Sequence, residues 1–309
     1  MRTVFRRSCL ALAAALAVGS VAASARAESI IVSSSNSGDS VQEIDLSGGT
    51  LGSLLKNVGS VAGVTTDSLG DVYVVSNTLQ EIFKITPKGT ATVFAHTGSS
   101  TLTAIAVDAA GNVYVGDSFN ADVVKYSPSG AQSMFTPFTK DPTGIVIGAN
   151  GDVYVDDFTG IQNYGTTGGE GIGTVTSVVD SGVTLSGLAM DSKGDLYGVA
   201  TGGDQIDRVT PRGSISAFVT VRQPAGVNLV GSLVFDNTGD LFAAASNGAI
   251  FEIESGTTTA KEIATVNGPV SLAVVIPEPS TWVLLAAGLG LLAWTLRRRL
   301  PAASARARR

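Results

Sequence analysis

Oxygen-bearing side chains follow several short Val- and Tyr-rich segments of this sequence, and they are the side chains best suited to chemistry. Asn77, Asp117 and Asp157 each lie at or just past the end of such a segment. Hard divalent cations such as Ca²⁺ and Mg²⁺ prefer amide and carboxylate oxygens as ligands. One hypothesis is therefore a divalent-cation site shared by these three residues. The alternative is that they close turns by accepting hydrogen bonds from their own backbone.

His96, in the segment TVFAHTGSS, is the only histidine of the chain. A histidine beside a metal suits general base catalysis, because imidazole titrates near neutral pH. The sequence has no second histidine and no G-x-S-x-G motif, so it offers no Ser-His-Asp triad. The alternative for His96 is an exposed position in a connecting loop.

Groups that could bind sugars or phosphates are scarce. Phe119 and Phe158 follow two of the Val- and Tyr-rich segments and are the best candidates for stacking on a sugar ring. Packing in the core or at the rim is their alternative role. The stretch YGTTGGEGIG (164–173) lacks the Lys-Ser/Thr pair of a phosphate-binding loop and has no helical pattern behind it. We interpret it as a surface loop.

The elements that must position these residues form a repeat. Its marker, Gly-Asp or Gly-Asn before a Val- or Leu-led strand pattern, recurs at steps of 41, 40, 43 and 45 residues, at Gly70, Gly111, Gly151, Gly194 and Gly239. An alternating apolar run precedes each marker, and several markers are followed by a further run that ends in Pro-x-Gly. Such alternation predicts strands, and the Gly-Asp or Gly-Asn pair predicts a tight hairpin. Four strands in about 42 residues are typical of one β-propeller blade.

The number of repeats predicts an all-β, six-bladed propeller. Residues 28–276 are 249 residues long, which is nearly six units, and five units carry the marker. The sixth unit is split: residues 29–49 supply its later strands and residues 268–275 its first. Joining them closes the ring and hides two free strand edges.

If the first strand of each blade is innermost, the residues just past each second strand share one face with the connections between blades. We expect these residues to ring the mouth of the central channel. They are Asn36, Ser76, Asn77, Asp117, Ser118, Asp156, Asp157, Thr201, Ser246 and Asn247.

The unit resembles the NHL-type repeat, in which a strand ends in Asp and is followed by x-x-Gly-[Asp/Asn]-[Val/Leu]-Tyr-Val. Gly148 replaces the aspartate in one unit, and the positions that match it are Asp67, Asp108, Asp191 and Asp236. The resemblance spans the middle of the chain and implies the propeller fold. Related propellers include lyases and lactonases that combine a metal with acid/base groups. We interpret the repeated aspartates as turn residues, because no reaction needs one catalytic group in every blade.

The N-terminal residues have the three parts of a secretory signal peptide. Arg2, Arg6 and Arg7 precede an apolar stretch, and Ala25-Arg26-Ala27 has the A-x-A form of a cleavage site. We expect signal peptidase to remove residues 1–27 and the protein to be exported. The only cysteine, Cys9, lies in this leader, so the mature chain would have neither disulfides nor thiol ligands.

The C-terminal residues 277–309 also have three parts. Pro277-Glu278-Pro279 precedes an uncharged stretch, 281–296, and the cluster Arg297, Arg298 and Arg299 follows it. This order resembles the PEP-CTERM sorting signal of Gram-negative bacteria, although LPAASARARR continues beyond the arginines. The resemblance implies an exosortase that removes the tail after transient anchoring in the inner membrane, and delivery to the outer envelope or extracellular polysaccharide. The alternative is a retained single-pass anchor with its arginines in the cytoplasm.

The region between leader and tail is strongly acidic. Of 20 Lys and Arg residues, four lie in the leader and six in the tail, whereas Glu278 is the only one of 26 acidic residues outside 28–276. The resulting net charge of about −15 disfavours nucleic acid and anionic membranes as partners. We therefore expect a binding or structural component of the envelope or matrix, with polysaccharide or an envelope protein as its partner. A metal-dependent lyase or lactonase is the alternative.

Overall fold

The computed structural model describes residues 29–34, 40–46, 49–137, 141–157, 160–165, 175–179 and 185–275. In this described part every regular element is a β-strand, and no helix is long and apolar enough to cross a bilayer. The strands all lie in one compact unit, Glu28–Ile276. The predicted leader and sorting tail fall outside the described residues, as do Asn36, Phe158 and most of the glycine-rich stretch.

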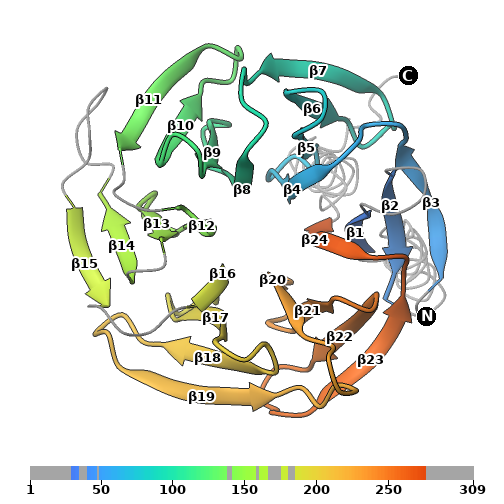
Figure 1. The fold of residues 1–309 in the computed structure, drawn as a ribbon, viewed down its shortest axis with the longest axis vertical. Helices are drawn as coiled ribbons and strands as arrows, with labels where there is room; N and C mark the ends of the chain where they lie inside the picture. The colour runs from blue at the N-terminus through green and yellow to red at the C-terminus, as the bar shows by residue number, and fades with distance from the viewer. Residues whose placement is uncertain are drawn as a thin grey trace, which may run out of the picture. The chain divides into compact units, whose positions relative to one another are not determined.

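The described residues form six four-stranded antiparallel sheets, arranged as blades around a central axis (Figure 1). The predicted six-bladed propeller is therefore confirmed. From the centre outwards, blade 1 consists of β24 (Pro269–Val275), β1 (Ser29–Ser34), β2 (Ser40–Asp45) and β3 (Thr50–Leu55). Blade 2 consists of β4 (Val61–Thr66), β5 (Val72–Ser76), β6 (Glu81–Ile85) and β7 (Ala91–His96). Blade 3 consists of β8 (Leu102–Val107), β9 (Val113–Asp117), β10 (Asp122–Tyr126) and β11 (Gln132–Pro137). Blade 4 consists of β12 (Gly144–Ile147), β13 (Val153–Asp156), β14 (Ile161–Tyr164) and β15 (Val175–Val179). Blade 5 consists of β16 (Leu185–Met190), β17 (Leu196–Ala200), β18 (Gln205–Val209) and β19 (Ile215–Thr220). Blade 6 consists of β20 (Leu229–Phe235), β21 (Leu241–Ala245), β22 (Ala249–Ile253) and β23 (Ala260–Thr265).

Each blade packs through both faces of its sheet, because it has a neighbour on either side. In β5, Val72 and Val74 pack toward blade 1, whereas Tyr73 and Val75 pack toward blade 3. Every residue of β5, β9 and β21 is buried. A strand that is buried on both faces is a nearly continuous apolar run, which explains the composition of the marker segments.

Blade 1 joins the two ends of the described chain. Its innermost strand, β24, pairs antiparallel with β1, so that Ser29 lies opposite Val275 and Val32 lies opposite Leu272. The split unit predicted from residues 29–49 and 268–275 is thus confirmed. The pairing of β24 with β1 completes the sixth four-stranded blade and closes the ring.

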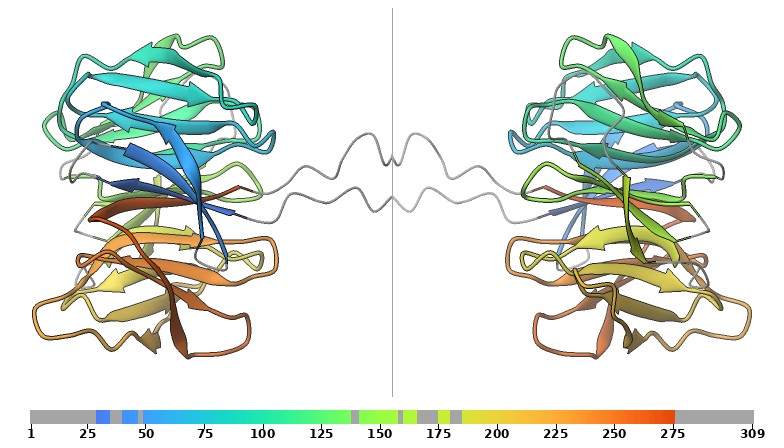
Figure 2. Two further views of the ribbon diagram at one scale, coloured as in Figure 1. Left: turned by 90° about the vertical axis from the view of Figure 1, so that its right-hand side faces the viewer. Right: turned by 90° about the vertical axis from the view of Figure 1, so that its left-hand side faces the viewer.

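The strands run between two faces of the propeller (Figure 2). We call one the turn face: it carries the hairpins between the first and second strands, such as Asp67–Asp71, and the paired residues Ser29 and Val275. We call the opposite one the loop face. It carries the loops after the second strands, such as 77–80, together with the connections between blades.

Backbone hydrogen bonds place the loops after the second strands next to these connections. The Asn77 N–H donates to Ser60 O at 2.8 Å, and the Ser118 N–H donates to Thr101 O at 3.0 Å. The prediction that both kinds of segment share one face is therefore confirmed.

The outermost strands modify their free edges with bulges. In every blade the pairing between the third and the outermost strand shifts register at least once. A bulge bends the strand and makes its edge a poor template for another chain. This matters because Leu51, Val93 and Met134 are exposed on three of these strands.

Candidate functional site

On the turn face, the repeated aspartates close the hairpins between first and second strands. Asp67 Oδ1 accepts bonds from the N–H groups of Leu69 and Asp71, both at 2.9 Å, and its Oδ2 accepts one from the Tyr73 hydroxyl at 3.3 Å. The same contacts recur in blades 3 and 5, at Asp108 and Asp191. The prediction that these aspartates are turn residues is confirmed.

A basic side chain on the third strand extends this network, and the sequence analysis missed it. Lys84 Nζ lies 2.6 Å from Asp71 Oδ2 and 5.0 Å from the centre of the Tyr73 ring. Arg208 Nε donates to Asp195 Oδ2 at 2.8 Å. The signal that could have revealed this pattern is register, because a basic residue stands opposite a marker tyrosine at Lys84, Lys125 and Arg208.

On the loop face, Asn77 links blades 2 and 3. Its Oδ1 accepts the Leu102 N–H at 2.9 Å, and its Nδ2 donates to Leu102 O at 3.0 Å. Leu102 begins the innermost strand of the next blade, so one amide side chain satisfies both backbone groups there. Asn77 therefore acts as a connector between blades.

Asp117 is the most heavily bonded carboxylate on the loop face. It is 1% exposed, and its Oδ1 accepts bonds from Thr101 Oγ1 (2.6 Å) and the Phe119 N–H (3.0 Å). Its Oδ2 accepts a bond from Asn120 Nδ2 at 2.8 Å. Burial acts to raise the pKa of Asp117, but hydrogen bonds from Ser99, Thr101 and Asn120 outweigh it and leave the pKa below its usual value. Asp117 is thus a charged residue that organises its own loop.

Asp157 lies at a different seam between blades. In β13, Val153 and Val155 pack against blade 3. Side chains alternate between the two faces of a strand, so Asp157, two residues after Val155, is directed to the same side. Asp117 follows Val115, which packs against blade 2. Among the described residues no group of three acidic, histidine or cysteine side chains is arranged to hold a metal ion. The shared Ca²⁺ or Mg²⁺ site stays a prediction.

Asp122 stands directly across the hairpin from Asp117, and its surroundings have the opposite effect on its pKa. Its Oδ1 is buried and, within the described part of the molecule, has no hydrogen-bond partner. Burial raises the pKa of Asp122, and the charge of Asp117 raises it further. The hairpin thus carries two carboxylates whose pKa values are moved apart by their surroundings.

The other described members of the predicted ring lie on the loop face, and most make hydrogen bonds within the protein. These bonds run from Ser76 Oγ to Val58 O, Ser118 Oγ to Thr101 O (3.0 Å), Thr143 Oγ1 to Asp156 Oδ2 (2.8 Å), Asn228 N to Ser246 Oγ (3.3 Å) and Ala249 N to Asn247 Oδ1 (3.1 Å). Thr201 lies in the loop after β17. None of the ring residues that the structure describes is among those that line the two cavities of the central channel.

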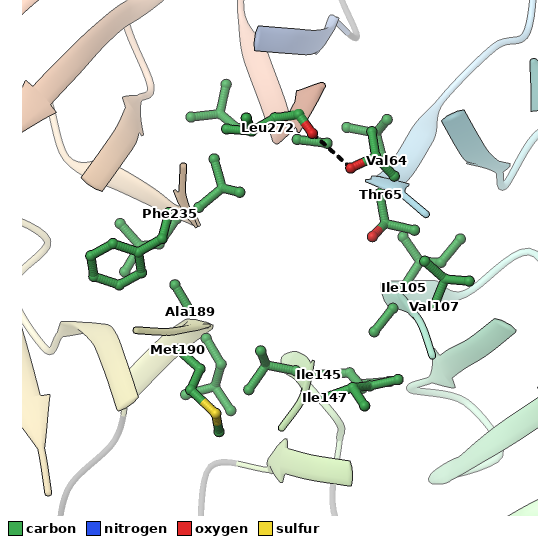
Figure 3. A pocket seen from close by; sticks show the side chains of 18 residues that line it. Val64, Thr65, Ile105, Val107, Ile145, Ile147, Ala189, Met190, Phe235 and Leu272 are labelled. Atoms are coloured by element: carbon green, nitrogen blue, oxygen red, sulfur yellow. Dashed lines mark hydrogen bonds between the residues drawn. The ribbon is translucent and has the colours of Figure 1, made fainter. Parts of the chain in front are cut away.

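The innermost strands line the channel, and its wall carries no acid or base. Figure 3 shows Ile105, Ile147, Met190 and Phe235 around a cavity of about 260 Å³. None of the described residues that line this cavity, or the smaller one above it toward the loop face, is titratable. This wall offers no general acid or base for catalysis.

Hydroxyl groups in the channel wall connect neighbouring blades. The Leu272 N–H donates to Ser232 Oγ at 2.7 Å, and the Val64 N–H donates to Ser271 Oγ at 3.0 Å. Thr66 Oγ1 donates to Val274 O at 2.7 Å. Because the channel-facing edge of an innermost strand has no ladder partner, these bonds satisfy backbone groups that would otherwise be unpaired.

His96 and Phe119 lie away from the channel wall. His96 ends β7, an outermost strand, with its side chain 78% exposed and Nδ1 3.3 Å from Glu81 Oε1. Phe119 is 82% exposed in the loop after β9, the largest exposed fraction among the large apolar side chains described. Phe119 is therefore exposed on the loop face, and His96 lies at the end of an outermost strand.

Comparison with known families supplies the identity of the tail. Residues 275–299 match the PEP-CTERM protein-sorting motif. The chain therefore carries this motif, which marks an exported, membrane-transiting protein processed by exosortase. A search of curated protein sequences gave no match.

Solved structures match the propeller. The chain is similar to a structure from a nidogen/laminin complex, with 13% identity, a TM-score of 0.67 and coverage of 81% of this chain and 99% of that one. It is similar to virginiamycin B lyase from Staphylococcus aureus, with 18% identity, a TM-score of 0.52 and coverage of 67% and 70%. A protein described as a candidate gluconolactonase matches with 16% identity, a TM-score of 0.58 and coverage of 72% and 82%. At these identities the similarity shows the fold alone.

Proposed function

We propose that this exported propeller is a non-enzymatic component of the cell envelope or extracellular matrix, and that it binds polysaccharide or an envelope protein through its loop face. Signal peptidase removes the leader, and the protein reaches the outer envelope or the exterior once exosortase has removed the tail. The observation that carries the proposal is the sorting motif at residues 275–299, which follows a closed propeller directly.

The engagement of the polar groups supports binding over catalysis. Asn77 and Asp117 are held by several hydrogen bonds each, and none of the described residues that line the channel is titratable. His96, the one histidine of the sequence, lies on an outermost strand. A catalytic acid or base needs to reach a bound substrate, and neither the channel nor these groups provides that combination.

The loop face supports recognition of a partner. Phe119, at 82% exposure, and Leu79, at 44%, project from the loops of neighbouring blades 3 and 2. Exposed aromatic residues on loops that a rigid scaffold holds are typical of binding surfaces. A flat sugar ring or an apolar protein side chain can stack on such a residue.

The sorting part of the proposal is tested in a Gram-negative host that has an exosortase. We expect the wild-type chain, shortened by its tail, in the outer envelope or the medium. A variant with alanine at Pro277, Glu278 and Pro279 is expected to remain full-length in the inner membrane. Equal release of the two chains contradicts this part of the proposal.

The binding part is tested by retention of the processed protein on isolated cell envelopes and matrix polysaccharide. We expect Phe119→Ser to reduce binding about tenfold, since loss of one well-placed aromatic anchor costs about 1–2 kcal/mol. Leu69→Ser is the matched control, because Leu69 is 59% exposed on the turn face. A larger loss from Leu69→Ser would move the binding surface to the turn face.

The rival function, a metal-dependent lyase or lactonase, is tested by titrating Ca²⁺ and Mg²⁺ into chelator-treated protein. We expect that no ion binds and that the melting temperature therefore stays constant over the titration. A saturable rise that Asp117→Ala and Asp157→Ala each abolish would establish an ion by linkage. The enzyme hypothesis would then take precedence, and lactones and sugar esters would be the first substrates to test.

A further inference from the structure

We propose that closure of the ring by β24 sets the inner limit of tail processing. The processing enzyme meets a folded propeller, cuts only beyond Val275, and leaves the closing strand complete. This inference goes beyond the function proposed above, because it depends on the sorting motif and on β24 but not on what the loop face binds.

The closing strand and the sorting motif share a residue. The motif match begins at residue 275, and Val275 is the last residue of β24. Leu272, Ala273, Val274 and Val275 are each at most 6% exposed. No linker therefore separates the core of the ring from the segment that must be processed, and Pro277 comes two residues later.

β24 is held along both edges. On one edge its residues pair with β1 in an antiparallel ladder from Ser34 opposite Pro269 to Ser29 opposite Val275. On the channel side, Leu272 N–H donates to Ser232 Oγ in blade 6, and Val274 O accepts from Thr66 Oγ1 in blade 2. Both neighbouring blades thus hold the strand in place.

A peptidase binds its substrate as an extended segment and needs free backbone groups on both sides of the bond that it cuts. The backbone of β24 is not free in the closed ring, and exposing it requires the ring to open. Cleavage inside a folded element follows the small population of molecules that are transiently open. The closed ring therefore makes every bond up to Val275 a poor substrate.

The same pairing fixes where the ends of the described propeller lie. Ser29 and Val275 lie opposite each other on the turn face. Phe119 lies on the opposite, loop face. Val275, the inner limit of cleavage, and the exposed Phe119 therefore lie on opposite faces of the propeller.

The reaction breaks one peptide C–N bond beyond Val275. The acyl carbon is transferred either to water, which leaves a new carboxylate on the propeller, or to an amine acceptor, which leaves an amide. In both cases the nitrogen of the departing tail takes a proton. The two products differ in mass, so one measurement identifies both the cut and the acceptor.

The first test is intact-mass spectrometry of the processed protein purified from a host with an exosortase. We expect every product to include Val275 at or near its C-terminus. A product that ends inside residues 269–274 would overturn the proposal. This result is independent of the binding function, because it requires no knowledge of the partner.

The second test loosens β24 without changing the tail. The double variant Ser232→Ala/Thr66→Val removes the two channel-side bonds that the backbone of β24 makes and leaves the bond from Val64 N–H to Ser271 Oγ. We expect cutting of the full chain within β24 by a broad-specificity protease to rise about tenfold or more, as the open population rises. Thr103→Val is the matched control, since it removes the corresponding bond to Pro142 O between blades 3 and 4. Equal cutting within β24 in the control and the double variant would overturn the proposal.

Discussion

The two faces of the propeller hold their backbone in place in different ways. On the turn face one arrangement recurs, in which an aspartate accepts hydrogen bonds from residues two, four and six positions on. On the loop face the contacts are less regular: the amide of Asn77 bonds to Leu102, whereas hydroxyl–carboxylate pairs join Thr101 to Asp117 and Thr143 to Asp156. The repeated contacts identify residues that maintain the fold of every blade, whereas the loop-face contacts differ between blades.

Removal of a repeated aspartate tests the turn face and should give the largest effect. Asp108 accepts bonds from the N–H groups of Ala110 and Asn112, from Asn112 Nδ2 and from the Tyr114 hydroxyl, which is buried. We expect Asp108→Ala to lower the free energy of unfolding by about 3 kcal/mol, because several donors lose a charged acceptor. Urea denaturation measures the loss.

Asp141→Ala is the control for this substitution, because Asp141 is exposed in the connection before β12 and should contribute little. A loss below about 1 kcal/mol for Asp108→Ala would show that the hairpin does not depend on its aspartate. Blade 4 already shows that a hairpin can form with Gly148 in that position.

Asp117→Asn tests the loop face and should give a smaller loss, of about 2 kcal/mol at neutral pH. The new amide nitrogen would face the Asn120 side-chain amide, so two donors would meet where Oδ2 now accepts a bond. The pKa of Asp117 is lowered in the folded protein. Its contribution is therefore present above the unfolded pKa and is lost as the pH falls through the folded pKa.

Denaturation at a series of pH values, with and without chelator, checks this prediction. The difference between wild type and Asp117→Asn should shrink below about pH 4 and should be the same with and without chelator. A difference that appears only when Ca²⁺ is present would favour a metal role for Asp117 over a turn role.

Most of the fold was accessible from the sequence, because a propeller repeats its signals. The Gly70 and Gly111 markers and their spacing gave the blades, and the two incomplete units gave the closing strand β24. The contacts across seams were not accessible, because they join residues whose proximity depends on packing between blades. The hydrogen bond from Asn77 to Leu102 joins residues 25 positions apart, and no pattern in either segment predicts it.

For the candidate site, too, the sequence predicted the face on which residues lie but not their contacts between blades. The sequence placed Asp117 and Asp157 on one face correctly, but side-chain alternation along each strand directs them toward different seams. It also gave no sign that Asp122 lies opposite Asp117, since that pairing depends on the register of a four-residue loop. Residue type predicts which atoms can act as ligands, and only the register predicts which ligands can meet.

Asp122→Asn sharpens the contrast within the loop face, because the buried Oδ1 of Asp122, unlike the oxygens of Asp117, has no hydrogen-bond partner among the residues that the structure describes. Burial and the charge of Asp117 raise its pKa, so stability is fully present below the unfolded pKa and falls as the pH rises through the folded pKa. We expect the variant to be about 1 kcal/mol more stable at pH 7. The gain should vanish in acid, and a loss at pH 7 would show that the Asp122 charge is stabilising.

Ala121→Gly should give the smallest effect and one of opposite sign to most substitutions. Ala121 has φ of 53°, and Gln80 has φ of 56° at the corresponding position of blade 2, whereas Gly248 occupies the loop of blade 6 at φ of 99°. A non-glycine residue at such an angle is strained by about 1 kcal/mol, and substitution by glycine relieves that strain. Part of the stability gained is offset, because glycine makes the unfolded chain more flexible. We expect Ala121→Gly to raise the free energy of unfolding by about 0.5 kcal/mol, whereas Ala110→Gly, at an exposed position in the turn-face hairpin of the same blade, lowers it by a similar amount. If both substitutions destabilise the protein, the loop is not strained, and the loop face is as well adapted to its backbone as the turn face.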